Sequence, residues 1–403
     1  MKIRSIALGL DIDWPLPLDR IARACAVLQA AARRFADAGF EVQTTRLVTQ
    51  PFAEIGSHDA AGWVLPMARE LDAACLDGGV EFVSVGPVRW SRLPAARARE
   101  YARAIPDVIM GTAHVSASIE TAAEGRVFGA AARAGGEIVA RLARETALGF
   151  GNFRFCTTAE CPPNIPFFPA AYHGGGVPRL TIGLETADVV RQAFDGPGTL
   201  DDLERRLRES FGEKLGAIEA IARALCAEQH VEYGGTDLTP APFPTDGASA
   251  AGMLEDLGVA AFGAAGTLSA AAAFTGMLKR LPFERVGYSG LMLPVLEDSV
   301  LAARTTDMAL TWSELLLYSA VCGTGLDTVP LPGDAAPAEL AALMLDVASL
   351  AATLRKPLSC RLFPVPGKRA GDLTEYDFPY FANAQVLSLA GRTSPRLFER
   401  FGA

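Results

Sequence analysis

The sequence predicts an α/β protein, a single closed or nearly closed barrel wrapped by helices. Segments with apolar residues at helical spacing alternate with short apolar runs over nearly all of the 403 residues. About ten of the short runs are expected strands. No linker or low-complexity stretch divides them, so residues 1–403 are expected to form one domain. An ordinary eight-fold barrel is the main alternative on this pattern alone.

In the first half of the chain, mainly apolar runs predict strands, and longer runs with helical spacing predict the helices between them. The expected strands are Ile3–Leu10, Glu41–Val48, Phe82–Val85 and Val108–Ile119. The expected helices are residues 17–39, Trp63–Cys75, Leu93–Ala104 and Arg126–Leu148. Gly39 is the kind of residue that ends a helix.

The second half repeats this alternation. Thr199 and Asp202 have the spacing of a capping box, which predicts a helix from there to about Gln229. Strands are expected at Leu180–Leu184, after residue 230, near Leu291–Val295 and at 358–368. The remaining expected helices are Ser249–Leu257, Thr267–Lys279, Trp312–Cys322 and 337–355.

Composition narrows the classes of partner. The formal net charge is −9, which argues against binding to nucleic acid or to an anionic membrane, because phosphates need a basic surface. Leu257–Leu278 is free of charge and long enough to span a bilayer, but Gly263 and Gly266 favour a buried strand, turn and helix. The 7 cysteines are scattered and form no CxxC pair, so we expect a reduced, cytoplasmic protein. With nucleic acid and membranes disfavoured by the net charge, the expected ligand is a small molecule.

The segment "FFPAAYHGGG" places His173 before three glycines. An HGGG loop in a lipase donates backbone N–H groups to an oxyanion, but that chemistry also needs a GxSxG nucleophile elbow. Ser289 in "GYSGL" lacks the closing glycine, so a serine hydrolase is a weaker hypothesis. The glycines, Gly174 and Gly175 among them, more simply allow a tight turn and close approach of the backbone. For His173 a pocket role and a structural role both stay open.

Carboxylates at or soon after apolar runs suggest a site for a hard cation, because α/β folds keep ligand sites there. Mg²⁺ or Ca²⁺ would suit such oxygen ligands, and Glu297, Asp298 and Asp327 are the expected metal ligands. The alternative is that Asp246 and Asp298 cap helices and Asp327 caps a turn. The four histidines lack zinc spacing, and no GxGxxG or Walker A motif supports a nucleotide cofactor.

Six motifs occur in an order that resembles the domain-of-unknown-function 711 (DUF711) family, also called uncharacterised protein family 0210 (UPF0210). They are "IRSIALGL", "FFPAAYHGGG", "DLTPAPFP", "GLMLPVLED", "CGTGLDTVPLPGD" and "RLFPVPGKRAGD". The resemblance spans nearly the whole chain. It implies a fold similar to pyruvate formate-lyase, a ten-stranded α/β barrel of two half-sheets, and a homodimer. It implies no particular activity.

The resemblance in fold raises the question of glycyl radical chemistry. Glycyl radical enzymes carry an RVxG-aromatic motif near the C-terminus, and this chain ends "LAGRTSPRLFERFGA" without it. "RVFGA" at Arg126–Ala130 lies in an expected helix and has alanine in place of the aromatic residue. We therefore expect the barrel without the radical.

The residues themselves predict an enzyme that acts on a small polar or anionic metabolite inside the barrel. Its chemistry would be hydrolysis, elimination or isomerisation by acid–base catalysis. The expected catalytic residues are His173, Glu160 and Asp237, and the expected substrate-binding residues are Arg4, Arg46, Glu120, Gly174, Gly175 and Cys322. The arginines would anchor a carboxylate or serve as ion-paired scaffold. Cys156, Cys161 and Cys322 are possible reactive thiols or core residues. A non-catalytic metabolite-binding or regulatory protein is the alternative function.

Overall fold

A computed structural model describes residues 1–56, 60–321, 323–389 and 395–401. Its centre is a mixed ten-stranded sheet in the order β8-β7-β1-β2-β3-β4-β6-β10-β9, with β5 paired to β4. The strands are β1 Lys2–Leu10, β2 Thr45–Thr49, β3 Phe82–Val88, β4 Val115–Ala123, β5 Arg126–Val127, β6 Phe155–Ala159, β7 Arg179–Glu185, β8 Glu232–Asp237, β9 Gly325–Pro332 and β10 Leu358–Val365. The chain is thus α/β, as predicted.

The sheet has three groups of strands. β1, β2, β3, β4 and β6 run parallel to one another. β7 with β8 and β10 with β9 are parallel pairs, and each pair joins the central group through an antiparallel contact. The starts of the central strands therefore lie at the same edge as the ends of the two outer pairs.

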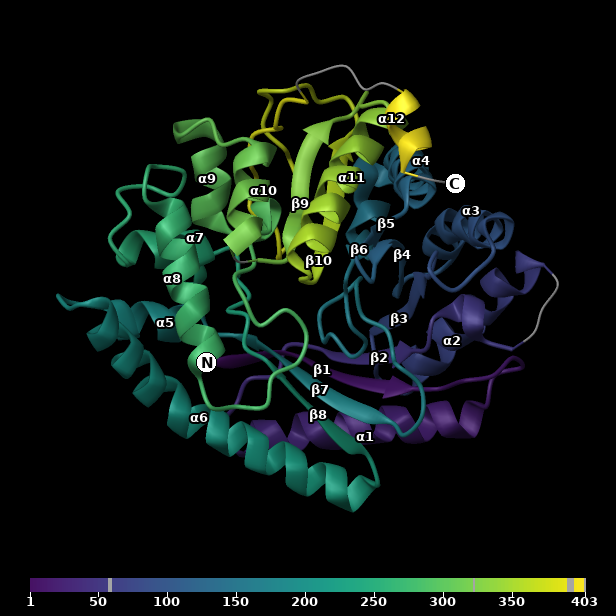
Figure 1. Cartoon of the computed structure of the whole chain (residues 1–403). Coiled ribbons are helices and arrows are strands. Elements are labelled where there is room, and N and C mark those ends of the chain that lie inside the picture. Colours follow the sequence, from purple (N-terminus) through teal and green to yellow (C-terminus); the bar gives the residue numbers. More distant parts are fainter. Residues whose placement is uncertain (57–59, 322, 390–394, 402–403) are drawn as a thin grey trace.

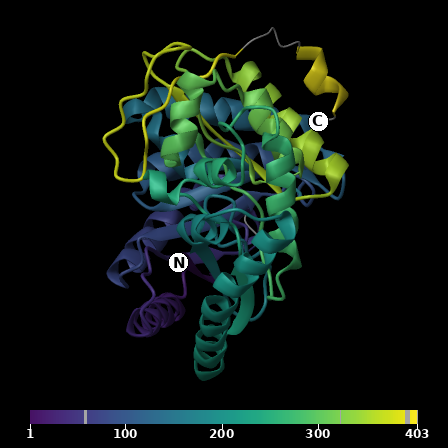
Figure 2. The same cartoon turned by 90° about the vertical axis from the view of Figure 1, so that its left-hand side faces the viewer.

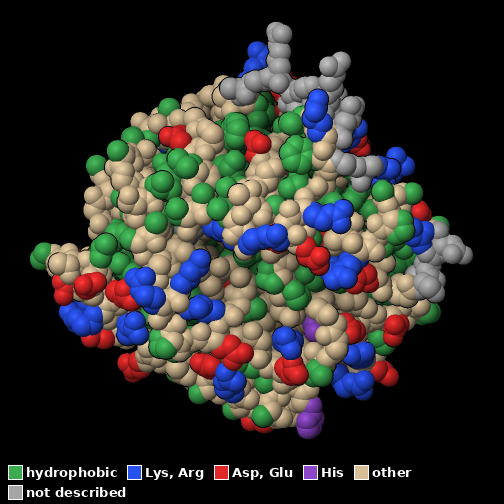
Figure 3. Space-filling view, in the orientation of Figure 1, with side chains coloured by type: hydrophobic (Ala, Val, Ile, Leu, Met, Phe, Trp, Pro, Cys, Tyr) green, Lys and Arg blue, Asp and Glu red, His purple; other side chains and the backbone are tan. Residues whose placement is uncertain are grey.

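Helices cover the outside of the curved sheet (Figure 1). They are α1 Leu18–Asp37, α2 Val64–Asp77, α3 Ala95–Gly111, α4 Gly129–Glu145, α5 Ala187–Phe194, α6 Leu200–Gln229, α7 Ala250–Asp256, α8 Thr267–Arg280, α9 Ser299–Asp307, α10 Trp312–Val321, α11 Pro337–Leu354 and α12 Pro395–Arg400. Figure 2, turned by 90°, shows α1 and α6 at the bottom and the yellow C-terminal segment at the top. On the face drawn in Figure 3, acidic and basic side chains are interspersed over the lower half.

The sequence explains why these segments bury their apolar residues. In α1 the buried Ile21, Cys25, Leu28 and Phe35 recur at spacings that place them on one helix face. All eight residues of β10, "LSCRLFPV", are buried, which is typical of a strand covered on both faces. One of the eight is an arginine, so the core contains a charge that needs partners.

Two connecting segments lie against the sheet and fill its interior. In residues 161–176, the Pro166 and Ala171 carbonyls accept hydrogen bonds from Ser5 of β1 and Ser84 of β3. Residues 285–294 form isolated bridges at both ends, from Arg285 to β8 and from Pro294 to β9. The same short segment therefore contacts both outer strands of the sheet.

Several sequence-based predictions of single elements were wrong. Val108–Ile119 was expected to be one strand, but α3 continues to Gly111 and β4 begins at Val115. Residues Leu291–Val295 form only an isolated bridge and a 3-10 turn, because Pro294 has no N–H for a strand ladder. β6, α5 and α9 are short elements that periodicity did not reveal.

The charge-free stretch Leu257–Leu278 is a turn region followed by most of α8, so the expected turn and helix form and the expected strand does not. Within the described residues, one helix has the length and apolar composition of a membrane span, and that helix is α11. It packs against α4 and against β4, β6 and β10, and half of its apolar window is buried in the fold.

Candidate functional site

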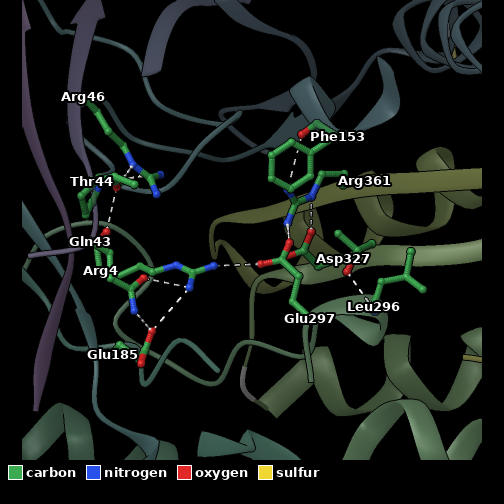
Figure 4. Close-up of polar contacts among 12 residues, drawn as sticks. Arg4, Gln43, Thr44, Arg46, Phe153, Glu185, Leu296, Glu297, Asp327 and Arg361 are labelled. Carbon is green, nitrogen blue, oxygen red and sulfur yellow. Dashed lines mark hydrogen bonds and ion pairs between the residues drawn. The ribbon is translucent and has the colours of Figure 1, made fainter. Parts of the chain in front are cut away.

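A chain of buried ion pairs crosses the interior of the sheet (Figure 4). Arg4 of β1 contacts Glu185 at 3.4 Å and Glu297 at 3.2 Å. The second Glu297 oxygen accepts from Arg361 of β10 at 2.7 Å, and the Arg361 Nε atom donates to Asp327 of β9 at 2.6 Å. Glu297 thus contacts two arginines from strands that are not neighbours in the sheet, β1 and β10. Burial alone would lower the pKa of Arg361, but Asp327 and Glu297 raise it above its ordinary value.

Arg46, at the start of β2, lies beside this chain of ion pairs but outside it. Its side chain is 8% exposed. The Nε atom donates to Thr44 Oγ1 at 3.0 Å, and Nη1 approaches the Pro166 carbonyl at 3.5 Å. The guanidinium carbon lies 5.4 Å from the ring centre of Phe82 and 5.0 Å from that of Phe168. Within the described part of the chain, no carboxylate forms an ion pair with Arg46.

This environment disfavours the charged form of Arg46. Burial is the largest cause and lowers its pKa to about 9, and the positive charges of Arg4 and Arg361 add to the effect. The charge of Glu297 acts in the opposite direction without offsetting them. A buried cation that lacks an anion within contact distance is costly to fold, so an anion from solution would be favoured here.

A cavity of about 310 Å³ opens onto these charges, which is in the range of small-molecule sites. Glu81 and Ala113 at its mouth are exposed, while Glu297 and Asp327 at its inner end are buried. The lining arginines are Arg4, Arg46, Arg154 and Arg361, and the lining phenylalanines are Phe82, Phe150, Phe153, Phe167, Phe168 and Phe378. The cavity lies at the starts of β1 to β4 and near the residues that follow β8.

His114 lies in the cavity wall, just before β4. Its Nδ1 atom is 3.2 Å from Asp72 Oδ1, and the other oxygen of Asp72 accepts from the Ala113 N–H at 2.8 Å. A proton held on Nδ1 by Asp72 leaves Nε2 as the basic nitrogen. His114 is therefore an oriented imidazole at the cavity.

His173 occupies a different place, at the other end of the central strands. It is buried, and its Nε2 atom is 3.7 Å from Asp11 Oδ1, just past the end of β1. The ring packs on Gly9 so closely that a Cβ there would be 2.5 Å from the His173 Nδ1 atom. The Gly176 N–H donates to the other Asp11 oxygen at 2.7 Å. The glycine loop thus donates a hydrogen bond to a carboxylate of the protein itself, that of Asp11. Gly174 and Gly175 lie in this turn.

Stability should depend on pH through His173. Burial lowers its pKa below the ordinary value of 6.5, although Asp11 opposes the shift. The unfolded chain therefore takes up a proton first, and stability is lost as pH falls from about 6.5 toward the folded-state pKa. We expect urea unfolding to show a larger loss between pH 7.5 and 5.5 in the wild type than in His173→Asn.

The matched control for this pH dependence is His230→Asn. His230 is exposed and has a φ of 54°, a conformation that asparagine tolerates. This variant should retain the wild-type pH dependence. An unchanged slope in His173→Asn would show that His173 titrates normally in the folded chain.

The other predicted catalytic residues hold loops in place. Asp237 is fully buried and accepts four hydrogen bonds, two from Thr239 and one each from the Tyr288 and Ser289 N–H groups. Glu160 accepts from the Gly125 N–H at 2.6 Å, and Glu120 accepts from the Ser91 N–H at 2.8 Å. Burial raises the pKa of both Asp237 and Glu120. The described lining of the cavity includes none of Glu120, Glu160, His173 and Asp237.

The three expected metal ligands do not share one point. Arg361 lies between Glu297 and Asp327, and Asp298 turns away to cap two helices. Asp298 accepts from the Ser249 hydroxyl, from the Ala250 and Ala251 N–H groups of α7 and from the Leu301 N–H of α9. The helix-cap alternative is therefore confirmed for Asp298. Among the described residues, no group of three or more His, Cys, Asp and Glu side chains could hold a metal ion.

Of the two cysteines that flank Glu160, Cys156 is buried and Cys161 is half-buried. Burial raises the pKa of Cys161 to about 12 and that of Cys156 well above its ordinary value. We expect both to resist iodoacetamide at pH 8 in the native protein and to react after unfolding, as peptide mass spectrometry can show. Rapid alkylation of native Cys161 would contradict this. The third candidate, Cys322, lies outside the described residues.

Four of the predicted site residues meet at the cavity: Arg4, Arg46, Glu297 and Asp327. Sequence reasoning missed Arg361, His114, Arg154 and the phenylalanines. One signal for Arg361 was present, a lone charge within the apolar run "LSCRLFPV", which a buried strand accepts only when that charge is paired.

The geometry can be compared with known proteins. A family model described as "Uncharacterised ACR (DUF711)" matches residues 1–379. The chain belongs to this family. A UPF0210 protein of Pyrobaculum islandicum is 33% identical over 377 residues, which cover 86% of this chain and 79% of that protein. A UPF0210 protein of Desulforudis audaxviator is 29% identical over 441 residues, which cover 100% of this chain and 92% of that protein. The match to the DUF711 model includes every cavity residue named above.

Proposed function

We propose that this DUF711 protein binds a small anionic metabolite in the interior cavity and acts on it by non-radical acid–base chemistry. The observation that carries the proposal is Arg46, a buried guanidinium that no carboxylate of the described residues contacts. An incoming anion would replace the lost hydration of Arg46 with charge-assisted hydrogen bonds. Arg4 is held by Glu185 and Glu297, so it positions the site and does not compete for the ligand.

The acid–base group that we propose is His114, because it lies in the cavity wall and Asp72 orients it. Proton transfer by such an imidazole suits elimination, isomerisation or hydrolysis of the bound acid. The alternative function is metabolite binding without catalysis. Asp72→Asn separates the two, because it would reverse the hydrogen bond to His114 and lower turnover while ligand affinity stays unchanged.

We further propose that the sheet forms a barrel similar to that of pyruvate formate-lyase. Support comes from residues 285–294, whose two ends form bridges with the two outer strands, β8 and β9. A barrel of this kind would enclose the cavity and keep water from the ion pairs, which strengthens electrostatic contacts.

The experiment is calorimetric titration of four probes, acetate, benzoate, succinate and inorganic phosphate, into wild-type protein and into Arg46→Met. At least one probe should bind the wild type and lose about 10- to 100-fold in affinity in the variant, the cost expected when one partner of a charge-assisted contact is removed. Arg205→Met is the matched control, because Arg205 is 59% exposed on α6. Equal affinity of the wild type and Arg46→Met for every probe would overturn the proposal.

A further inference from the structure

We infer that the ligand of this cavity is an aromatic monocarboxylate whose carboxylate contacts Arg46 and whose ring lies among phenylalanines. The inference rests on the proposed function and specifies its substrate class. The charges around the cavity, the arrangement of its aromatic rings and its size all support this class of ligand.

The charges around the cavity favour a single negative charge beside Arg46. Arg4 and Arg361 pair with three buried carboxylates, those of Glu185, Glu297 and Asp327. The charge of Asp72, which is 14% exposed, acts on Arg154 against the effect of burial. Glu81, an acid of the lining, is exposed at the mouth, where water screens it. Arg46 is buried and forms no ion pair among the described residues, so one anionic group is favoured there.

A second anionic group on the ligand would be unfavourable. Glu297 and Asp327 line the inner end of the cavity, and Arg361 already pairs with both of them. An added carboxylate or a dianionic phosphate would meet these charges at close range in a site with little water. The Arg154 guanidinium, the other cation of the lining without a described ion pair, donates to the Val115 carbonyl at 3.0 Å and to the Ile109 carbonyl.

The apolar part of the cavity is aromatic. Phe150 and Phe153 are stacked at 5.4 Å, and Phe378 meets their edges at 4.9 and 5.5 Å. Phe168 covers one side of Arg46, and Arg46 and these rings line the same cavity. Rings arranged in this way favour a further ring in an offset or edge-on position over an aliphatic chain of the same size.

The volume agrees with this class of ligand. A cavity of about 310 Å³ has room for a phenyl ring, a short chain and a carboxylate. Phe150, Phe153 and Phe378 are only half-buried. A ring placed against them would remove this apolar surface from water.

The test compares size-matched acids by calorimetry at pH 7.5: 3-phenylpropanoate, 3-cyclohexylpropanoate, succinate and inorganic phosphate. We expect 3-phenylpropanoate to bind at least 10-fold tighter than succinate or phosphate. We expect it to bind about 2- to 10-fold tighter than 3-cyclohexylpropanoate, the range of an added aromatic contact. Phe378→Leu should remove the preference for phenyl over cyclohexyl and keep the dependence on Arg46.

The outcomes separate this inference from the proposed function. Succinate or phosphate binding as tightly as 3-phenylpropanoate, and weakened by Arg46→Met, would overturn the aromatic monoanion and leave the anion site in place. Equal affinity for phenyl and cyclohexyl acids in the wild type would also overturn it. No binding that depends on Arg46, by any of the four probes, would overturn both proposals. Thermal unfolding of each variant checks that the fold is retained.

Discussion

Arg361→Met is expected to lower the free energy of unfolding by about 3–5 kcal/mol, because it removes the cation that two buried carboxylates share. Arg361 is 7% exposed, and both Glu297 and Asp327 are buried beside it. Arg4 still contacts Glu297 in this variant, but Asp327 loses the partner of its 2.6 Å contact. Urea denaturation at pH 7.5, followed by circular dichroism, measures the change.

The control is Arg223→Met, which removes a 52% exposed arginine that also contacts two carboxylates, Glu219 and Glu284. That variant should lose about 1 kcal/mol or less. A similarly small loss in Arg361→Met would contradict a dry, buried ion-pair chain.

Arg46→Met is expected to act in the opposite direction and stabilise the unliganded protein by about 1–3 kcal/mol, because it removes a buried charge that contacts no carboxylate in the part of the chain that the structure describes. Its hydrogen bond to Thr44 and its contacts with Phe82 and Phe168 reduce the gain. A methionine side chain can occupy the same apolar surroundings. A stabilising change that weakens ligand binding is typical of a functional residue held at a cost to the fold.

The pH dependence of this effect has a definite sign. The folded-state pKa of Arg46 is lowered to about 9, while the unfolded chain keeps its ordinary, higher value. The wild type is therefore penalised below pH 9, and the penalty decreases as pH rises above 9. The stability difference between Arg46→Met and the wild type should shrink between pH 8 and 10.5 in urea titrations. A variant less stable than the wild type at pH 7.5 would contradict the account, because it would mean that Arg46 is already paired.

The alternation of strands and helices was readable from the sequence because local periodicity determines it. Arg4 and Arg46 were identified for a related reason, since a charge on a strand that starts in an apolar core must face something polar. β6 is five residues long and rich in threonine and cysteine, so its strand character depends on its neighbours β4 and β10.

The sequence does not show that side chains from distant strands meet at one cavity. Arg4 of β1 and Arg361 of β10 contact the same carboxylate, Glu297, although four strands lie between β1 and β10 in the sheet. The histidines show the same difficulty. His173 stands in the more conspicuous motif, yet His114, beside a helix end, lines the cavity. A glycine-rich turn indicates that some group lies close to the backbone. Here that group is the Asp11 carboxylate of the same chain.

The most direct measurement is a crystal structure of the protein soaked with 4-bromobenzoate, with data collected at the bromine absorption edge. The account predicts an anomalous peak beside Phe150, Phe153 and Phe378, and the carboxylate within about 3 Å of the Arg46 guanidinium. A bromine peak confined to the outer surface, with Arg46 still facing an empty cavity at saturating ligand, would contradict the account.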